Sequence, residues 1–391
     1  MTEFINAHMW QTAVWPSKLK KTGNFFGESP TFETSNIVQG KMLSNGMFYG
    51  LNRVHAANTF NTVYAYPFLN PNYSFMIRLM GTSFKQLLTV PGVRYTIFVT
   101  NDNTYANRGF SYNNNLSQWQ LNGAGTLSNM WVGTAGEKLA RDLQLHIVST
   151  PSDELNNLNG EGIIKSYGGE CIKFKNNQVW SSGNADTANT ANVTGYRDFT
   201  NGRVYFINKL LEYSERSPVG HLRILAGYSP TTGRLVKPTQ FYNFYRYILL
   251  SGLVSDTSDL NRATITGVSS GDYYTFFVPT SDSLIAAVNK GIIPDYHSIT
   301  DDNRSIVQAM VLYHIANKII IANGDEEDSG TTKTAYKDLD GITHTITVNN
   351  IKYNMVLKDE KGKSFTLIRE KSDNLSSMSI IHLLNGFLRR L

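Results

Sequence analysis

The sequence repeats itself, and this repetition constrains the fold more than any single motif does. The segment Thr96–Asn103 (TIFVTNDN) returns as Thr275–Asp282 (TFFVPTSD). In the same order along the chain, Leu145–Ile147 (LHI) returns as Tyr313–Ile315 (YHI). Self-similar elements that recur in the same order are typical of duplicated structural units. We therefore predict two homologous units.

A further element occurs three times and closes each unit. Asn45–Val54 (NGMFYGLNRV) resembles Asn201–Leu210 (NGRVYFINKL), and Met378–Phe387 (MSIIHLLNGF) is a looser copy. The stretch before the first copy is too short for a whole unit. It is predicted to be the C-terminal part of a further unit or an N-terminal extension. The predicted divisions are residues 1–55, 56–215 and 216–391.

Apolar spacing in the second unit predicts helices first and strands afterwards. Helices are expected at 241–252, at 281–290 behind a Thr280 or Ser281 cap, and at 304–315. Runs rich in β-branched and aromatic residues predict the strands, at 273–278, 319–322, 342–348, 351–357, 364–368 and 379–384. Because the two kinds of element are segregated rather than alternating, the fold class is predicted to be α+β.

Composition excludes several classes of protein. Charged residues make up only 17% of the 391 residues and the net charge is +5, without the concentrated basic patch of a nucleic-acid reader. The single cysteine, Cys171, rules out a disulfide framework and a multi-thiolate metal site. No apolar stretch reaches the ~20 residues of a membrane span. No signal segment opens the chain, so the protein is either cytoplasmic or exported by a signal that this sequence does not include.

Three motifs of the second unit resemble a known family. Thr275–Leu284 (TFFVPTSDSL) resembles the first conserved box of fasciclin-type (FAS1) domains, a strand that runs into a capped helix. Tyr313-His314 resembles the family's central Tyr-His pair, and Ile380–Leu388 resembles its final box. The unit at about 72–211 departs from the pattern, with Thr100 where proline is usual and Leu145 in place of the tyrosine. The resemblance implies tandem fasciclin-like domains, each a short-stranded β-sandwich or wedge with helices packed on it.

The resemblance also implies a contact surface. In relatives the region near the Tyr-His pair is implicated in adhesion, which makes Tyr313, His314 and His146 candidate binding residues. Read from the residues alone, a histidine on an apolar helical stripe also fits a buried side chain that hydrogen-bonds the backbone.

Aromatic residues in an Asn-rich segment offer a second candidate surface. Trp119 and Trp131 lie in this segment with Tyr105 and Tyr112. Ring faces beside amide groups suit the faces and hydroxyls of sugars, and they suit protein partners equally well. Alternatively, the rings attach a long insertion to its own domain.

Candidate catalytic and metal-binding motifs are weak. Gly267–Gly271 fits the G-x-S-x-G pattern around Ser269, but the predicted strand follows the motif instead of preceding it, so the segment is interpreted as a turn. Asp325–Asp328 could supply oxygen ligands to calcium, although contiguous acids lack the alternating spacing and also fit a solvated loop. The histidines are dispersed. We predict no catalytic residue, no metal and no cofactor.

These observations predict a non-enzymatic adhesion or interaction protein on the cell surface. The expected setting is a bacterial outer-surface lipoprotein whose lipid anchor lies outside this sequence, so contact with a membrane is expected only through that anchor. The expected partner is a surface protein or a glycan, and no nucleic acid. The alternative is a carbohydrate-binding accessory lipoprotein of a glycan-uptake system, which would use Trp119 and Trp131.

Overall fold

The computed structural model describes residues 2–121, 134–269 and 271–390, and these divide into two compact units. The first unit holds the chain up to Ala106 together with Val148–Asn156 and Thr194–Asn208, and the second unit holds the rest. These units cut across the divisions predicted at 55/56 and 215/216, because the chain passes from one unit to the other several times. The predicted divisions describe repeats in the sequence, and as domain boundaries they stay a prediction.

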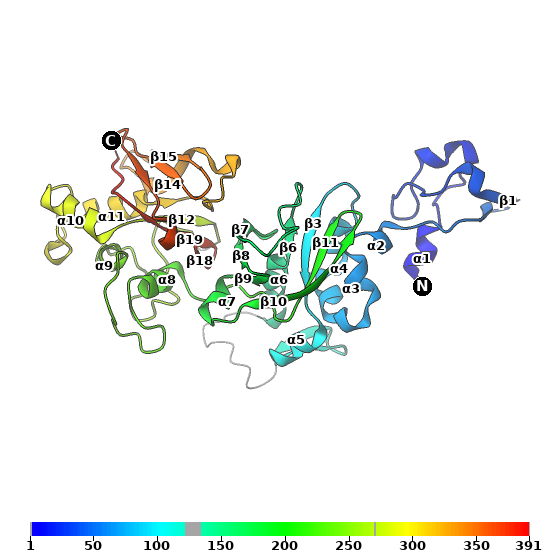
Figure 1. Ribbon diagram of the computed structural model, residues 1–391, viewed down its shortest axis with the longest axis horizontal. Coiled ribbons are helices and arrows are strands. Elements are labelled where there is room, and N and C mark those ends of the chain that lie inside the picture. Colours follow the sequence, from blue (N-terminus) through cyan, green and yellow to red (C-terminus); the bar gives the residue numbers. More distant parts are fainter. Residues whose placement is uncertain (1, 122–133, 270, 391) are drawn as a thin grey trace. The chain divides into compact units, whose positions relative to one another are not determined.

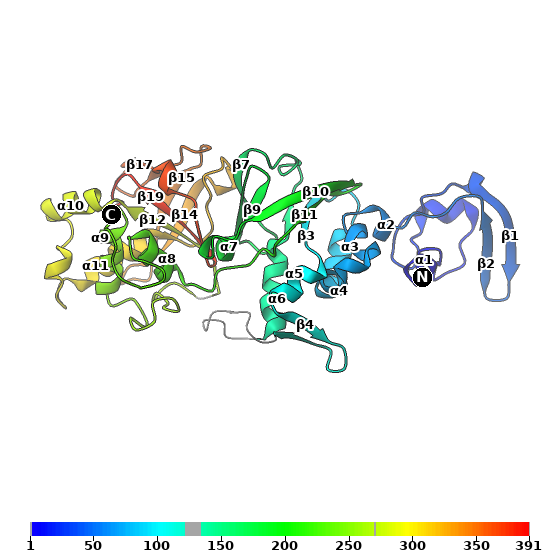
Figure 2. The ribbon, with the colours of Figure 1, turned by 60° about the horizontal axis from the view of Figure 1, so that its bottom comes forward.

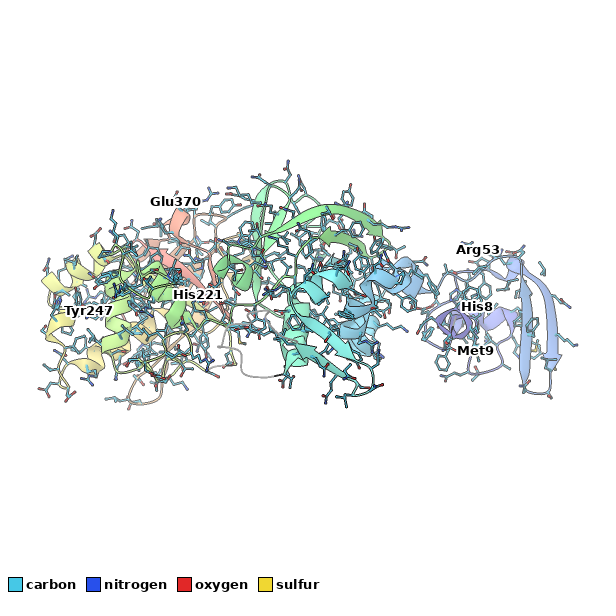
Figure 3. All side chains as sticks on the ribbon, turned by 90° about the horizontal axis from the view of Figure 1, so that it is seen from below. His8, Met9, Arg53, His221, Tyr247 and Glu370 are labelled. Atoms are coloured by element: carbon cyan, nitrogen blue, oxygen red, sulfur yellow. The ribbon has the colours of Figure 1, made fainter. Side chains whose placement is uncertain are left out.

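The first unit begins with a small lobe organised around a buried histidine. The elements of the lobe are α1 (Thr2–Ala7), the 3-10 helices η1 (Pro16–Lys21) and η2 (Thr34–Asn36), and the strands β1 (Ile37–Leu43) and β2 (Gly46–Leu51). The ring of His55 is 1% exposed and lies within 3.2 Å of both Asn24 and Thr31. Burial and the nearby His8 lower the pKa of His55. Figure 3 labels His8, Met9 and Arg53 in this lobe.

The remainder of the first unit combines short helices with a buried parallel strand pair. Its helices are α2 (Asn58–Asn61), α3 (Ala65–Leu69), η3 (Pro71–Tyr73), α4 (Ser74–Leu88) and α5 (Asp102–Asn107). The start of α4 is held by Asp102, whose carboxylate accepts hydrogen bonds from the backbone N–H groups of Ser74 and Phe75 at 3.2 and 2.9 Å. The strands are β3 (Tyr95–Val99), β6 (Ile147–Ser149), β10 (Ala191–Phe199) and β11 (Gly202–Ile207), in the order β6-β3-β11-β10.

The second unit opens with a hairpin, a helix and an antiparallel sheet. The hairpin is formed by β4 (Phe110–Asn113) and β5 (Gln118–Leu121), and α6 (Ala135–Leu145) follows. The sheet consists of β7 (Glu161–Lys165), β8 (Cys171–Lys175) and β9 (Gln178–Trp180) beside the first residues of β10, and α7 (Ser182–Asp186) lies between β9 and β10 in the chain. A capping box at Thr134 and Glu137 begins α6, because each side chain accepts from the other residue's backbone N–H.

The later part of the second unit places four helices beside an eight-stranded sheet (Figure 1). The helices are α8 (Pro218–Leu225), α9 (Tyr242–Leu250), α10 (Ser281–Asn289) and α11 (Arg304–Tyr313), with the short η4 (Tyr296–Ser298), η5 (Glu326–Asp328) and η6 (Arg369–Lys371). The strands are β12 (Tyr274–Pro279), β13 (Ile315–Ala316), β14 (Gly330–Lys337), β15 (Thr343–Asn349), β16 (Val356–Lys358), β17 (Ser364–Thr366), β18 (Asn374–Ser376) and β19 (Ser379–Leu384). Their order is β17-β16-β15-β14-β13-β12-β19-β18. The predicted α+β class is confirmed: β12 lies between α9 and α10, and the other strands of this sheet follow α11.

The structure confirms the repeat at the level of strand pairing. In the first unit β3 pairs in parallel with β11, which places Phe98 opposite Tyr205. In the second unit β12 pairs in parallel with β19, which places Phe277 opposite His382. The facing rings stack in both pairs, with centroids 5.7 and 5.5 Å apart and planes inclined by 16° and 15°. The two predicted strands therefore occupy equivalent places, each beside the closing element of its own repeat.

The strand prediction was wrong at 319–322 and at 351–355, where only the end of the predicted strand 351–357 is formed, as β16, and it missed β14. The apolar run at 319–322 forms no strand, because its N–H groups are bound by side chains: Ile320 by Thr275 Oγ1 at 2.8 Å and Ala322 by Asp373 Oδ1 at 3.0 Å. The long strand beside it in the chain is β14, a polar segment in which no strand was predicted.

Candidate functional site

Two histidines end helices and organise the last segment of each repeat. His146 follows α6 and His314 follows α11, and both rings are fully buried. The Nε2 atom of His146 accepts a hydrogen bond from the Leu211 N–H at 3.0 Å, and that of His314 accepts one from the Leu388 N–H at 3.1 Å. His314 Nδ1 lies 2.8 Å from the carbonyl oxygen of Met310, to which it donates. Burial lowers the pKa of His314 to about 4, so this ring is neutral.

Tyr313 is buried as completely as its neighbour. Its side chain is 1% exposed, and its hydroxyl donates to the Thr345 carbonyl at 3.0 Å and accepts from the Glu360 N–H at 3.2 Å. Burial raises the pKa of Tyr313 above its ordinary value. The assignment of Tyr313, His314 and His146 as contact residues is therefore corrected. All three side chains are buried, and the hydrogen bonds of Tyr313 and His314 and that of His146 Nε2 join backbone groups, so these side chains are not part of the accessible surface.

The aromatic candidate Trp119 packs against its own domain. In the β4-β5 hairpin Trp119 lies opposite Tyr112, with ring centroids 5.1 Å apart and planes inclined by 74°. A Cβ atom placed on Gly136 would lie 3.6 Å from Trp119 Cδ1, so the half-buried indole rests on the first turn of α6. Trp131 lies outside the described residues. The described geometry fits the interpretation in which the ring attaches the insertion to its domain.

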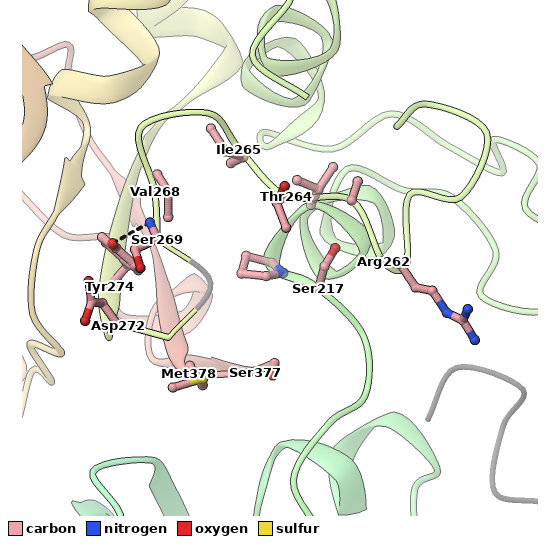
Figure 4. A pocket seen from close by; sticks show the side chains of 13 residues that line it. Ser217, Arg262, Thr264, Ile265, Val268, Ser269, Asp272, Tyr274, Ser377 and Met378 are labelled. Carbon is pink, nitrogen blue, oxygen red and sulfur yellow. Dashed lines mark hydrogen bonds between the residues drawn. The ribbon is translucent and has the colours of Figure 1, made fainter. Parts of the chain in front are cut away.

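Ser269 lines a small cavity whose described lining contains no histidine. The cavity has a volume of about 160 Å³, and Ser217, Ile265, Tyr274 and Met378 also line it (Figure 4). The backbone N–H of Ser269 donates to the Tyr274 hydroxyl at 2.7 Å. None of the lining residues is a histidine, and Asp272 is the carboxylate among them. The segment is a turn that precedes β12, as predicted.

The acidic loop Asp325–Asp328 is held by lysines. Asp328 is 2% exposed, both of its carboxylate oxygens lie 2.8 Å from Lys165 Nζ, and Lys318 Nζ lies 3.4 Å away. Asp325 caps η5 and accepts from the Glu327 N–H at 3.0 Å. Within 2–121, 134–269 and 271–390, no three His, Cys, Asp or Glu side chains are grouped so as to hold a metal ion. The alternative of a solvated loop holds only in part, because Asp328 is buried.

A cluster of serine, histidine and aspartate escaped the sequence analysis. His221 on α8 (labelled in Figure 3) lies with Nε2 3.0 Å from Asp186 Oδ1 and with Nδ1 2.9 Å from Ser376 Oγ. Burial alone would raise the pKa of Asp186, but hydrogen bonds from His221 and Ser214 hold it below its ordinary value. Ser376 and Ser214 are 4% and 1% exposed. No substrate can reach either hydroxyl, so the cluster acts as a buried polar network. No motif could reveal it, since its members come from distant parts of the chain.

Buried charges around α6 form another structural network. Lys138 is 1% exposed, and its Nζ lies 3.3 Å from Asp142 and 3.7 Å from Glu215. Arg141 pairs with Glu170 at 2.7 Å and covers the ring of Tyr213 at 3.7 Å from the centroid. Burial raises the pKa of Asp142 even though Lys138 opposes this effect. Both cations are therefore paired with carboxylates inside the fold.

The most exposed apolar surface of the first unit is the β1-β2 hairpin. Val38, Met42 and Phe48 have 67%, 66% and 58% of their surface exposed, and six of the seven residues of β1 are exposed. β1 and β2 form a two-stranded sheet of their own (Figure 2). Two-stranded hairpins are marginal in water and gain stability from a further layer or strand. The hairpin therefore exposes apolar side chains on a sheet of only two strands. We name it the N-terminal hairpin, residues 37–51.

Comparisons with known proteins found similarity among solved structures only. No protein-family model matches the chain, and no curated protein matches it. The chain is structurally similar to the FAS1 domain pair of the insect cell adhesion molecule fasciclin I, with 14% sequence identity and a TM-score of 0.32. The match covers 82% of this chain and 98% of that chain. That structure contains domains of the kind that the three sequence motifs resemble, and the likeness carries no information about the function or a ligand of this chain.

No helix among the described residues has both the length and the apolar character that crossing a bilayer requires.

Proposed function

We propose that the protein is a non-enzymatic interaction protein that serves adhesion or assembly at a cell surface, and that the N-terminal hairpin is its contact surface. The observation that carries this proposal is the exposure of Val38, Met42 and Phe48 on a sheet of only two strands. Met42 pairs with Met47 and Phe48 pairs with Lys41, so these two side chains project from opposite faces of the hairpin. Apolar side chains that are exposed on a two-stranded sheet favour contact with a protein partner.

Two further features support an interaction role. The His221 cluster is buried and its side chains are hydrogen-bonded to one another, so it holds the shape of the fold. The motifs of the second unit resemble fasciclin domains, a family associated with adhesion. In this proposal the chain is displayed outside the cell, on the outer surface of a bacterium through a lipid anchor that is not part of the sequence.

Removing the apolar side chains of the hairpin should weaken adhesion. In the triple variant Val38→Ser, Met42→Ser, Phe48→Ser we expect beads coated with the full chain to bind beads coated with a cell-surface extract at least fivefold less. The substitutions delete exposed surface and leave the core of the lobe in place, so thermal unfolding should stay close to that of the parent chain. Bead aggregation followed by light scattering gives the measurement.

A matched control changes equally exposed apolar residues elsewhere. Val236, Leu339 and Ile342 are 76%, 106% and 61% exposed. Their replacement by serine should leave bead binding unchanged. Equal losses in the two triple variants would show that general surface hydrophobicity, rather than the hairpin, causes the adhesion.

The alternative function, carbohydrate binding, depends on Trp119 and Trp131. Because the indole of Trp119 rests on α6, we expect Trp119→Ala to lower the free energy of unfolding by about 2 kcal/mol, less than for a fully buried ring. Urea unfolding followed by circular dichroism measures this loss. A glycan screen by calorimetry separates the two functions: heat of binding that disappears in the Trp119→Ala variant while the fold persists would favour the alternative.

A further inference from the structure

The closing strand of each repeat lies between two neighbours. β11 has its hairpin partner β10 on one side and the parallel strand β3 on the other. β19 has its hairpin partner β18 on one side and the parallel strand β12 on the other. The two parallel neighbours share a sequence pattern, Tyr-Thr-Ile-Phe-Val in β3 and Tyr-Thr-Phe-Phe-Val in β12. In both repeats, therefore, the closing strand pairs in parallel with a strand of the same sequence pattern.

The third copy of the closing element has only one of these neighbours. β2 belongs to Asn45–Val54, the segment that matches Asn201–Leu210, and it pairs with β1 across a two-residue turn that closes at Leu43 and Gly46. β10 and β11 are joined by a two-residue turn as well. Within the described ranges no strand lies along the other edge of β2 (Figure 2). This is the edge along which β11 and β19 bind their parallel strands.

Two glycines at equivalent positions of the repeat differ in what lies beside them. Gly202 opens β11, and a Cβ atom placed on it would lie 1.8 Å from the carbonyl oxygen of Tyr95 in β3. Gly46 opens β2 at the same place in the repeat, with φ of +159° against +139° at Gly202, but a Cβ atom there would meet nothing within 4 Å. A backbone that passes close to Gly202 in the complete repeat is thus absent beside Gly46.

Hydrogen-bonding groups and an aromatic ring are repeated as well. The N–H of Tyr95 donates to the Asn201 carbonyl at 2.9 Å, and the N–H of Tyr274 donates to the Met378 carbonyl at 3.1 Å. The equivalent acceptor before β2 is the carbonyl of Asn45. Tyr49 stands in the sequence where Tyr205 stacks on Phe98. An arriving strand would therefore find an acceptor for its first N–H group and a ring for its phenylalanine.

We propose that the free edge of β2 binds, in parallel, a β-strand of a partner polypeptide with the pattern Tyr-Thr-(Ile/Phe)-Phe-Val. Strand addition to an open sheet edge gains its affinity from backbone hydrogen bonds and its specificity from alternate side chains. A second folded copy of this chain does not supply the strand, because its β3 lies between β6 and β11 and its β12 lies between β13 and β19. This inference rests on the proposed function in that it names the kind of partner the N-terminal hairpin takes.

The test tethers a known strand to the intact chain. A peptide with the sequence of residues 94–100 (RYTIFVT) is fused to the N-terminus of the full chain through a flexible linker of about 20 residues, which raises its effective concentration. We expect hydrogen exchange across residues 44–51, measured by mass spectrometry, to slow at least tenfold relative to a fusion that carries a scrambled peptide. Equal exchange in the two fusions would overturn the proposal.

Two proline variants distinguish the two edges of the hairpin. The closing pair Leu43 and Gly46 exchange hydrogen bonds, so the alternation of antiparallel pairs turns the N–H of Met47 toward the free edge of β2 and that of Met42 toward the outer edge of β1. Proline is tolerated where an edge N–H faces solvent. Met47→Pro should remove the protection, and Met42→Pro should keep it. Equal loss in both variants would contradict binding at β2.

Further measurements keep the test independent of these variants. A tethered peptide with proline in place of its isoleucine should give no protection, and this change leaves the protein itself unaltered. The untethered full chain should be monomeric by light scattering; self-association that Met47→Pro abolishes would make a second copy the occupant and overturn our choice. If the tethered peptide gives no protection but the triple serine variant still loses bead binding, strand addition is rejected. The proposed function is then retained.

Discussion

Replacing Gly202 with alanine is expected to lower the free energy of unfolding by more than about 3 kcal/mol. The new Cβ atom would lie 1.8 Å from the carbonyl oxygen of Tyr95, which is backbone, and the φ of +139° at this position already disfavours a side chain. Relief requires β3 and β11 to separate, which breaks the hydrogen bond from the Tyr95 N–H to the Asn201 carbonyl. Urea unfolding followed by circular dichroism measures the loss.

Gly46→Ala is the matched control for this prediction. Gly46 has a similar φ, but the space beside it is open, so only the backbone conformation opposes alanine and the expected cost is about 1 kcal/mol. Equal costs at the two positions would show that conformation, and not the neighbouring strand, requires glycine here. In the fusion that carries the tethered strand, Gly46→Ala should remove the protection of residues 44–51 from hydrogen exchange. The new Cβ atom would collide with the bound strand, as the Cβ atom of Gly202→Ala collides with β3.

His314 is expected to make the protein sensitive to acid. Burial lowers its pKa from 6.5 to about 4 in the folded chain, whereas the unfolded chain binds a proton near the ordinary value. Between these two values the unfolded state holds more protons, so stability from this group is complete above pH 6.5 and is lost as the pH falls toward 4. The loss amounts to about 3 kcal/mol at 1.36 kcal/mol per unit of pKa. Urea unfolding at a series of pH values between 7.5 and 4 measures it.

The His314→Gln variant isolates this contribution. Glutamine offers an oxygen to the Leu388 N–H and does not titrate, so the variant should lack the part of the pH dependence that His314 causes. Other groups remain in both proteins and cancel in the comparison, including Asp142, whose raised pKa acts in the opposite direction. Identical pH profiles for the parent chain and the variant would contradict a buried neutral His314.

Local signals predicted the elements that depend on neighbouring residues. The cap at Thr280 accepts from the Ser283 N–H at 3.2 Å and begins α10, as the sequence suggests. The helical stripe of α11 and the aromatic run of β12 also lie where they were expected. Each of these signals concerns residues within a few positions of one another, and such short-range patterns are directly visible in a sequence.

The candidate site could not be predicted in the same way. Sequence reasoning selected Tyr313 and His314 because of their residue types, yet both are buried. Sequence reasoning identified Asn45–Val54 only as a copy of the closing element. The order of its apolar residues did not indicate that the hairpin would be exposed. Exposure depends on whether a third strand or a helix covers a sheet, and that partner is distant in the chain or belongs to another molecule.

The sequence by itself determined the duplication, the α+β class and the strand-to-helix motif that each repeat contains, because these follow from residue order and short-range periodicity. Only the tertiary structure decided which polar groups are buried in pairs, as Asp328 is with Lys165, and which strand edge is left open, as that of β2 is. Burial and pairing join residues that are far apart along the chain, so no local pattern records them.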